Sequence, residues 1–576
     1  MFLIAITKNK LGIFFPGIVL NEIISGSAII TVITDNSTSK FIPESGGFSV
    51  VEAPLLNRQN DRFDLFSKST FRTNTLTIFK STHCPRTIYF HHNANNEFFC
   101  ATHIGLLRKA GIKIDENQDM LPEFFTYRYI MPPNTLFKRI KQLSNGSRLR
   151  VECPHGQCHL QRLEEYQPPA PEKKVDSFDA EIGQLVRYLS QSLKGFHNYQ
   201  DSVGAILSGG IDSSITFQAC KKYLGVQHSY STEYPFEDPQ LNTERQYALS
   251  AAKALGTEHH LFESTVHDYL YGLLDCITLT EEPVHHLQSV PIYLLFKNGI
   301  PAERSIIVQG LGAGGIVGNF RNFLYWREKS AAQIFQFKPT RDLLSFLSRV
   351  TGKAKHFTNC MNKVHLEYPL SNPRNLIWDW HAYGNKQWVC KEFGVMQEDI
   401  IKHRYEIYKT RKTTIYDLWS LYSLLGDEAI TLGLWGKIAE ANQKILFSPW
   451  YEQTFLDYAF SLPWSFKLSK PENKIRKGMG RYLGIPEFIL NRRKSGFGLL
   501  QKGWAQKDGA LEPLVPLAGR VWPISQIREV QDSNPQNQMI FWNMINYALW
   551  KRLIIDQEPI ENLKSELNTA IKNQHG

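Results

Sequence analysis

Residues 203–214, VGAILSGGIDSS, join a short apolar run to a glycine-rich turn and then to a helical pattern. Glycines in such a turn let backbone N–H groups approach a phosphate closely, and the helix N-terminus behind them adds partial positive charge. Small hydroxyl side chains donate further hydrogen bonds, and Asp212 can hold a magnesium ion against the phosphates. The alternative is an ordinary glycine turn in which Asp212 and Ser213 only cap the helix. Because strand, turn and helix follow one another in register, the stretch favours a phosphate-binding loop.

The segments around this loop alternate between strand and helix patterns. Apolar residues at helical spacing fill 177–196, ahead of the loop, and the helix that the loop opens extends to Gly225. A strand pattern follows at 228–234 and a helical one, closed by a glycine, at 244–256. This alternation predicts a parallel sheet with helices on both faces. From about residue 330 the chain is mostly helical in pattern and rich in aromatic residues.

The first 165 residues have a different composition, with many β-branched and aromatic residues between Asn, Ser and Gly turns. They predict short strands, beginning with the apolar run at the N-terminus, and a hairpin that turns at Pro154–Gly156. Residues 166–176, YQPPAPEKKVD, contain three prolines and four charges and predict a linker. We therefore expect domains at 1–165 and 177–557, the linker at 166–176, and a polar tail at 558–576 that frays.

Composition excludes several classes of protein. Among 576 residues, 42% are apolar and 21% charged, which excludes disorder, collagen and coiled coil as descriptions of the whole chain. No run of 18 apolar residues occurs, so a membrane span is not expected. Eight cysteines and the lack of a basic segment before the N-terminal apolar run predict a cytoplasmic protein. The net charge of +10 fits an anionic substrate such as a nucleotide, although a generally basic surface explains it equally well, and it gives no argument for nucleic acid as a partner.

The loop resembles the pyrophosphate-binding loop of the ATP pyrophosphatase superfamily, and three further segments are similar to asparagine synthetases within it. These segments are ERQYALSAAKALGTEHH at 244–260, SPWYEQTFLDYAFSLP at 448–463 and KIRKGMGRYLGIPEFILNRRKSGF at 474–497. The resemblance covers about residues 180 to 550. It implies an α+β amidotransferase-like β-sandwich domain followed by an α/β doubly wound parallel-sheet ATP pyrophosphatase domain with a helical C-terminal part. It also implies that ATP and Mg²⁺ are used to adenylate a carboxylate, with release of pyrophosphate.

The resemblance assigns roles to residues of this chain that match the family's motifs. It implies that Asp212 is a metal ligand, that Lys494 stabilises charge at the reacting carboxyl and phosphate, and that Glu452 replaces a catalytic-site Asp. A fixed lysine would lower the energy of a transition state that concentrates negative charge; the alternative is a solvated basic run with Arg492 and Arg493. The residues it assigns to ATP are Leu207, Ser208, Gly209, Gly210, Asp212, Ser213, Thr232, Gln309 and Gly310.

The segment 310–315, GLGAGG, departs from the family pattern GxGxDE. Gly314 stands where the family carries a magnesium ligand, Gly315 follows in place of an acid, and Leu311 stands where asparagine synthetases carry a catalytic Glu. Another acid, weak adenylation or a pseudoenzyme would each explain these losses. The acids that we consider as substitutes for the missing ligand are Glu233, Glu281, Glu282 and Glu452.

Residues 124–149 are similar to the end of the family's glutamine amidotransferase domain, which attacks glutamine through an N-terminal cysteine. Here position 2 is Phe and the nearest cysteine is Cys84, so we expect no glutamine hydrolysis. The β-lactam synthetases and lasso-peptide cyclases, which this architecture resembles, have lost the same nucleophile. They adenylate a carboxylate and let an amine of the same molecule attack it.

The sequence therefore predicts an ATP-dependent amide-forming ligase or cyclase that acts on a peptide or an amino acid, with a lasso-peptide macrocyclase as the specific candidate. A precursor peptide and a maturation protease are the expected partners, without membrane or nucleic acid. The alternatives are an asparagine synthase that uses free ammonia, a nucleotide- or peptide-binding pseudoenzyme and, against the C-terminal resemblance, a tRNA-modifying enzyme.

Lys494→Ala should abolish turnover while ATP binding is retained. A charge that interacts mainly with the transition state affects the rate more than ground-state affinity. Pyrophosphate release and ATP affinity, measured on the same preparation, check this. Equal losses of both would make Lys494 a binding residue.

Overall fold

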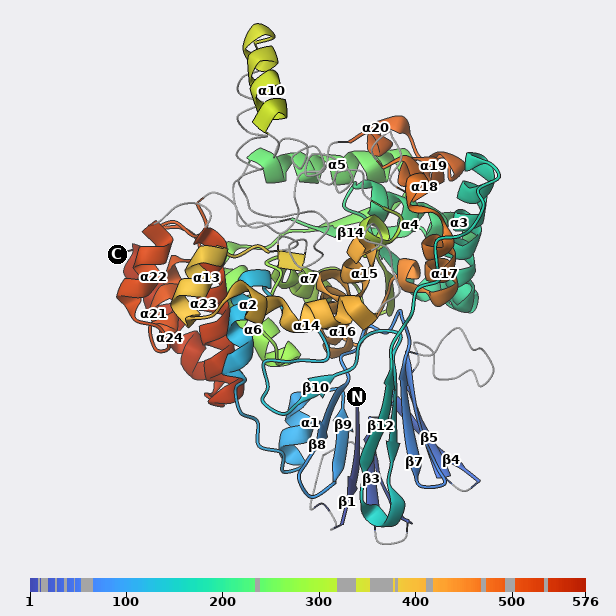
Figure 1. The fold of residues 1–576 in the computed structure, drawn as a ribbon, viewed down its shortest axis with the longest axis vertical. Coiled ribbons are helices and arrows are strands. Elements are labelled where there is room, and N and C mark those ends of the chain that lie inside the picture. Colours follow the sequence, from blue (N-terminus) through green and yellow to red (C-terminus); the bar gives the residue numbers. More distant parts are fainter. Residues whose placement is uncertain are drawn as a thin grey trace.

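The computed structural model describes most of the chain as an antiparallel sandwich, a parallel sheet and a C-terminal set of helices (Figure 1). The described residues are 1–8, 11, 19–25, 28–35, 39–45, 47–52, 66–233, 239–318, 338–352, 377–378, 382–410, 418–467, 473–492, 503–532 and 537–575. In this part of the chain, no helix has the length and apolar character needed to cross a membrane.

Two six-stranded sheets form the N-terminal sandwich, and each contains strands that are distant in sequence. The first sheet has the order β10-β8-β9-β1-β3-β2 and the second β12-β11-β7-β6-β5-β4. The strands of the first are β1 (Phe2–Thr7), β2 (Val19–Ser25), β3 (Ala28–Thr34), β8 (Tyr89–His92), β9 (Phe98–Ala101) and β10 (Lys141–Gln142). Those of the second are β4 (Ser39–Glu44), β5 (Gly47–Glu52), β6 (Ser67–Arg72), β7 (Thr75–Lys80), β11 (Arg148–Glu152) and β12 (His159–Glu164).

Strand β1 is central to the first sheet, as its apolar sequence requires. It pairs antiparallel with β3 on one side and β9 on the other, with Ile4 opposite both Val32 and Cys100. All six of its residues are buried. One set of its side chains packs against the second sheet, which confirms the expected N-terminal strand.

Between β9 and β10 the N-terminal part also contains helices and a 3-10 turn: α1 (Ile104–Lys109), η1 (Gln118–Met120) and α2 (Leu121–Tyr127). The predicted hairpin forms between β11 and β12, with the short turn η2 (Pro154–Gly156) between them. Residues 165–177 contain no helix or strand. Polar contacts tie this stretch to the helical part of the chain: for example, Tyr166 donates to Asp457 at 2.7 Å, and Lys173 pairs with Glu181.

The second sheet system is parallel and has the order β15-β14-β13-β16-β17. From β13 the chain builds β14 and β15 on one side, then returns to place β16 and β17 on the other. The strand order therefore reverses between β13 and β16, and in such sheets ligands bind at the carboxyl ends of the strands at this reversal. The strands are β13 (Val203–Ile206), β14 (His228–Thr232), β15 (Glu258–Phe262), β16 (Ile306–Val308) and β17 (Ile445–Phe447).

The connecting helices follow the predicted alternation. Helix α3 begins at a Ser177 cap that accepts from the Ala180 N–H, and α4 ends at Gly225 with φ of 76°. Helix α4 packs on β13 and α3, while α16 (Asp427–Ala441) packs on β17, α6 and α7. The elements of this part are α3 (Phe178–Leu193), η3 (Lys194–Ser202), α4 (Ile211–Leu224), α5 (Pro239–Leu255), α6 (Val266–Thr280), α7 (Ser289–Leu294), η4 (Leu295–Gly299) and α8 (Ala313–Ile316).

The C-terminal part is helical, and α10 (Lys338–Val350) projects from the body of the molecule (Figure 1). The other elements are α13 (Lys386–Phe393), α14 (Gln397–Thr410), α15 (Leu418–Leu425), η5 (Pro449–Tyr451), α17 (Gln453–Ser461), α18 (Trp464–Lys467), α19 (Lys474–Tyr482), α20 (Glu487–Leu490), η6 (Glu512–Leu514), α21 (Val515–Ala518), α22 (Ile524–Asp532), α23 (Gln538–Trp550), η8 (Lys551–Ile555) and α24 (Ile560–His575).

The fraying predicted for the polar tail at 558–576 is wrong in the described residues, because Ile560–His575 form helix α24. Leu563 and Leu567 are fully buried, and α24 packs against α6 and α21. Glu566 also pairs with Arg552 at 2.9 Å. The apolar residues recur four positions apart, which is enough to bury one face of a helix whose other face is polar.

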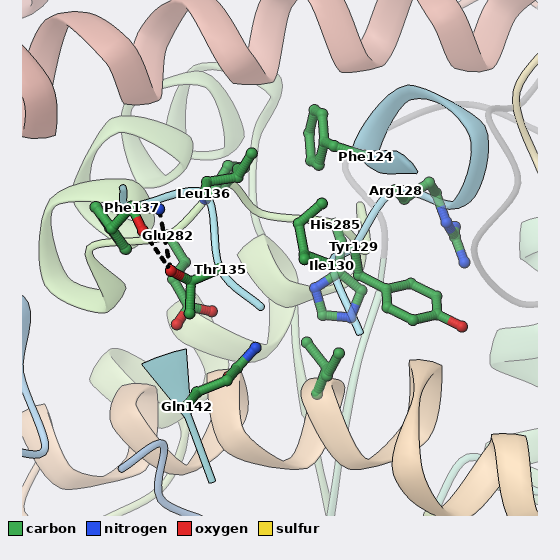
Figure 2. Close-up of a pocket in the computed structure, with 12 residues that line it drawn as sticks. Phe124, Arg128, Tyr129, Ile130, Thr135, Leu136, Phe137, Gln142, Glu282 and His285 are labelled. Carbon is green, nitrogen blue, oxygen red and sulfur yellow. Dashed lines mark hydrogen bonds between the residues drawn. The ribbon is translucent and has the colours of Figure 1, made fainter. Parts of the chain in front are cut away.

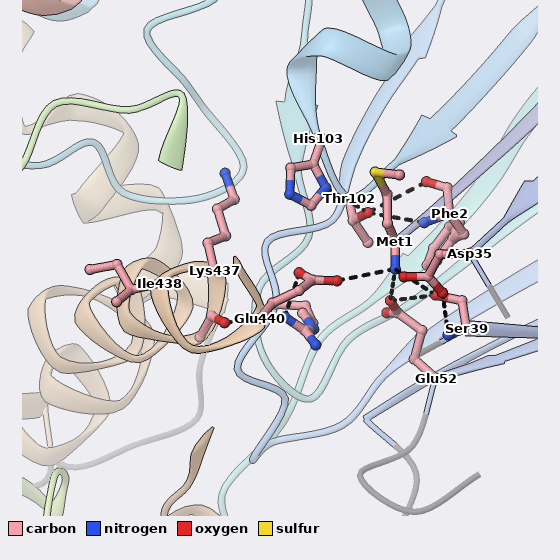
Figure 3. A network of polar contacts seen from close by, with 12 residues as sticks. Met1, Phe2, Asp35, Ser39, Glu52, Thr102, His103, Lys437, Ile438 and Glu440 are labelled. Atoms are coloured by element: carbon pink, nitrogen blue, oxygen red, sulfur yellow. Dashed lines mark hydrogen bonds and ion pairs between the residues drawn. The ribbon is translucent and has the colours of Figure 1, made fainter. Parts of the chain in front are cut away.

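Helix α16 joins the parallel-sheet half of the chain to the sandwich through its small and charged residues. Arg86, from the loop before β8, donates to the Gly436 carbonyl at 3.1 Å and pairs with Glu440. The Met1 amine donates to Glu440 at 3.1 Å and to Asp35 at 2.7 Å (Figure 3). Burial lowers the pKa of this amine, but the surrounding carboxylates outweigh burial and raise it overall.

Gly436→Ala should destabilise the protein by about 1–3 kcal/mol, the usual cost of overpacking. A Cβ at Gly436 would lie 1.7 Å from the Pro85 carbonyl oxygen, so the helix and the loop must separate. Gly183→Ala is the control, since its Cβ would lie 3.6 Å from Tyr482 and alanine favours the helix. Thermal unfolding of both variants checks this, and equal melting temperatures would show that α16 tolerates the shift.

Candidate nucleotide site

The glycine-rich loop lies at the carboxyl end of β13, beside the reversal of strand order. Gly209 has φ of 70°, and a Cβ there would lie 2.4 Å from the Tyr247 carbonyl oxygen, so α5 packs directly on the loop. Gly210 is the N-cap residue of α4. The Ser213 hydroxyl accepts from the Ser208 N–H at 3.2 Å and donates to the Gly210 carbonyl at 3.1 Å. These bonds hold the loop in a closed turn with the first N–H groups of α4 behind it.

A second glycine segment approaches the loop from β16. A Cβ at Gly310 would lie 2.8 Å from the Asp212 carbonyl carbon and 2.9 Å from the Ser213 nitrogen. Gln309 is 3% exposed, and its backbone N–H donates to the Phe447 carbonyl at 3.0 Å. Within the described chain its side-chain Nε2 has no hydrogen-bond partner. The segment that follows β16 therefore meets the first turn of α4 backbone to backbone at the predicted ATP residues.

A cavity of about 60 Å³ opens beside the loop between β13, β14, β15 and α5. Ser208 and Thr232, both predicted to bind ATP, line it together. Leu207 is fully buried next to it, with its N–H donating to the Tyr230 carbonyl at 2.8 Å. The structure thus places Ser208 and Thr232 on one cavity, with Leu207 buried beside it. Charged side chains at its edge are already paired: Glu233 with Arg245, and Glu244 with Arg492.

Arg476 was not identified as a site residue from the sequence, yet it contacts the loop directly. Its Nη1 donates to Asp212 Oδ1 at 2.8 Å and to Oδ2 at 3.0 Å. Arg492 is also directed to the loop, where its Nη1 donates to the Ser208 carbonyl at 3.2 Å. Both arginines lie in the segment 474–497, whose similarity to asparagine synthetases indicated Lys494. The same similarity could have indicated the two arginines. Lys494 itself lies outside the described residues.

The acids considered as substitute metal ligands have other partners. Glu452 caps α17, accepting from the Thr454 N–H at 2.8 Å and the Phe455 N–H at 3.2 Å. Glu281 accepts from the Ile104 and Gly105 N–H groups at 2.6 and 2.7 Å, at the start of α1. Glu282 accepts from the Tyr89 hydroxyl. Of the four, Glu233 alone lines the cavity beside the loop. The catalytic role predicted for Glu452 stays a prediction.

The two glycines at the family's acidic positions are enclosed by other groups. A Cβ at Gly314 would lie 3.4 Å from Arg476 Nη1. One at Gly315 would lie 2.4 Å from Ser423 Cβ and 2.9 Å from Glu428 Oε2. Side chains of helix α15 and the start of α16 thus fill the space beside Gly315.

The described residues around Asp212 do not fit a magnesium site. Mg²⁺ requires several oxygen ligands in near-octahedral geometry, and both oxygens of Asp212 accept from a guanidinium. The groups of possible metal ligands in the described chain lie elsewhere, at His228, Glu258 and His260 and at His285, His286 and Asp427. The second group faces a cation, since Arg128 Nη2 lies 3.6 Å from Asp427.

A second cavity, of about 40 Å³, lies at the junction of the two halves of the chain (Figure 2). Phe124, Tyr129 and Leu136 line it from the N-terminal part, and Glu282 and His285 from the other. Burial lowers the pKa of His285 well below its ordinary value, so the imidazole is neutral near pH 7. Its Nε2 lies 2.9 Å from the Thr431 hydroxyl. The lining is mostly apolar, and none of the predicted ATP residues lies on it.

Comparisons with known proteins agree with the geometry. A model of the asparagine synthase family matches residues 187–516, more than half of the chain. The glutamine-hydrolysing asparagine synthetase 1 of Bacillus subtilis (strain 168) is 22% identical over 436 residues, which are 72% of this chain and 64% of that protein. A Mycobacterium bovis protein, provisionally named as a glutamine-hydrolysing asparagine synthetase, is 19% identical over 486 residues, 80% of this chain and 71% of its own length. The chain thus spans less than two thirds of the first relative.

Gly310→Ala should weaken nucleotide binding by at least about tenfold, because displacing positioned groups by about 1 Å has effects of that size or more. Its Cβ would lie 2.8 Å from the Asp212 backbone and would push the loop away from β16. Isothermal titration with ATP measures the affinity. Gly314→Ala is the matched control, since its Cβ would make an ordinary contact with Arg476. Equal affinities in the two variants would mean that nucleotide does not bind at this loop.

Proposed function

Because the chain belongs to the asparagine synthase family, we propose that it is an ATP-dependent ligase that joins a carboxylate to an amine. In the first step a carboxylate oxygen attacks the α-phosphorus of ATP, and pyrophosphate leaves. In the second step the amine attacks the carbonyl carbon of the acyl adenylate, AMP leaves and the amine loses a proton. The products are an amide, AMP and pyrophosphate.

The observation that carries this proposal is the closed loop at the reversal of strand order. We assign the phosphates to the N-terminus of the 14-residue helix α4, where the backbone N–H groups of the loop and the hydroxyls of Ser208 and Ser213 lie. The cavity between β13, β14 and α5 receives the base and ribose beside Thr232. Lys494 supplies positive charge to the adenylation transition state. Binding of the phosphates, binding of the base and ribose, and stabilisation of the transition state are the three roles that adenylation requires of the protein.

The source of the amine is the second part of the proposal. In the described part of residues 1–165 the thiols are Cys84, Cys100, Cys153 and Cys158, and all four are buried. Burial raises the pKa of the Cys84 thiol to about 12, and it also raises that of Cys100. A nucleophilic thiol requires a lowered pKa and access to substrate. We therefore propose that the amine comes from the substrate itself and not from glutamine.

A peptide that carries both the carboxylate and the amine is the substrate that this reasoning favours, and the product is then a macrocyclic amide of the lasso-peptide type. A precursor peptide and a maturation protease are the partners that such a reaction needs. The alternative is asparagine formation from aspartate and free ammonia. The names of the relatives favour asparagine formation equally, but they name glutamine hydrolysis as part of it. The replacement of both acids at Gly314 and Gly315 favours a nucleotide- or peptide-binding pseudoenzyme as the third candidate.

Exchange of radiolabelled pyrophosphate into ATP separates these candidates, because it reports a reversible adenylate without the second step. Linear peptides with a side-chain carboxylate and a free amine should support exchange and should then lose one water by mass spectrometry. Exchange with aspartate, followed by asparagine formation from ammonium, would support the alternative. The pseudoenzyme would bind ATP and show no exchange with either substrate class.

We expect no release of glutamate from glutamine, since all four cysteines within residues 1–165 are buried and burial raises the pKa of the Cys84 and Cys100 thiols. A coupled glutamate dehydrogenase assay measures this, with added glutaminase as the positive control. Cys84→Ser should leave amide formation unchanged. Glutamate release by the wild type that Cys84→Ser abolishes would show that the N-terminal half has an active glutaminase centre.

A further inference from the structure

We propose that Arg476 takes the place of a magnesium ion held by the chain at the phosphate loop, so that nucleotide binds there without a metal ligated by Asp212. This inference rests on the proposed function, because it concerns the same loop and the same nucleotide. The loop should therefore bind the nucleotide phosphates whether or not they carry magnesium.

The position of the guanidinium is the first argument. Arg476 comes from α19, its side chain is 5% exposed, and its Nη1 contacts both oxygens of Asp212. The same Nη1 lies 3.4 Å from where a Cβ at Gly314 would be. One cationic nitrogen therefore lies between the residue that the family uses as one metal ligand and the position from which the other is missing.

The guanidinium is also held in place. Its Nη2 donates to Asn473 Oδ1, and Asn473 has φ of 60° at the start of α19. The Nε of Arg476 is buried and has no hydrogen-bond partner within the described residues. Arginine presents its donors in a rigid planar arrangement that suits carboxylate and phosphate together. A fixed cation with a donor to spare beside a phosphate loop is consistent with a binding role.

The surroundings of Gly315 are an independent argument. Ser423 and Glu428 approach the Cβ position of Gly315 to 2.8 Å or closer and 2.9 Å respectively. An acidic side chain there would meet both helix α15 and a carboxylate. Neighbouring side chains therefore occupy the space in which acidic side chains at positions 314 and 315 would lie. The loss of two acids without other changes would instead leave that space empty.

The electrostatic consequence defines the test. Without a cation, Asp212 at the N-terminus of α4 would repel the phosphates of a nucleotide. Arg476 neutralises this carboxylate, so the loop N–H groups and the helix N-terminus can attract the phosphates. Removing Arg476 should leave Asp212 unpaired, and binding should then require a divalent cation. Removing both charges should restore binding without metal.

The experiment is calorimetric titration with α,β-methylene-ATP, in EDTA and again in magnesium chloride. Wild-type affinity should differ by less than about threefold between the two conditions, a small change on the affinity scale. Arg476→Met should lose about tenfold or more in EDTA and recover with magnesium. Asp212→Asn combined with Arg476→Met should bind in EDTA as the wild type does. Arg481→Met, on the exposed face of the same helix, is the control for the loss of an arginine.

A direct metal measurement keeps the inference testable if Arg476→Met does not fold. Mn²⁺ binding, followed by electron paramagnetic resonance without nucleotide, should be the same in the wild type and in Asp212→Asn. It should also be unchanged in Gly314→Asp, because the new carboxylate would pair with Arg476. Mn²⁺ binding that Asp212→Asn removes would overturn the inference.

The outcomes also separate the inference from the proposed function. Wild-type nucleotide binding that disappears in EDTA and returns with magnesium would overturn the role of Arg476 and leave the ligase standing. Absence of nucleotide binding in both conditions would overturn the proposed function, and the inference with it.

Discussion

The close approach of the end of β16 to the start of helix α4 is the constraint on which the candidate site depends. Between β13 and β16 the strand order reverses, and at that point Gly310 lies against the backbone of Asp212 and Ser213. Any side chain at position 310 would separate the two segments. Because they touch, the loop after β13 is supported from one side by β16 and from the other by Tyr247 of α5. The turn is therefore closed and its N–H groups are oriented before any ligand arrives.

Charge at the site is arranged locally, and the surplus of +10 over the whole chain says little about it. Each acid that faces the loop or its cavity is matched by an arginine: Asp212 by Arg476, Glu244 by Arg492, and Glu233 by Arg245. Buried or half-buried carboxylates need such partners, since an unpaired charge away from water is costly. The result is a candidate phosphate site in which each acid is paired with a guanidinium group.

The sandwich domain remains closely bound to the other half of the chain. Lys437 of α16 is buried and donates to the Tyr89 hydroxyl at 2.8 Å and to the Thr280 carbonyl at 2.7 Å. Arg86 crosses the same interface to Glu440, whose pKa is lowered overall because Arg86 and the Met1 amine outweigh the effect of burial. These contacts join β8, α6 and α16. A domain without an accessible thiol thus still contributes charge pairs and packing that position the helices beside the parallel sheet.

The sequence by itself determined the order of the elements and the location of the loop. VGAILSGGIDSS predicts strand, turn and helix because its glycines and small hydroxyls permit little else, and the alternation around it predicts the parallel sheet. The sandwich strands and the turn at Pro154–Gly156 follow from local patterns of the same kind. The asparagine synthase family was recognised from separate segments within 244–497. Each of these segments is a continuous stretch of sequence, so its pattern is visible without knowledge of the fold.

Only the tertiary structure decided which side chains meet. Arg476 is 264 positions from Asp212 in the sequence, and nothing local indicates that its guanidinium contacts that carboxylate. The helix α24 was predicted as a fraying tail because its few leucines, Leu563 and Leu567, form a face only when α6 and α21 are there to cover it. The acids proposed as substitute metal ligands have helix N-termini, a tyrosine or an arginine as partners for the same reason. Residue type and spacing limit what a side chain can do, but its partner is determined by how distant elements pack.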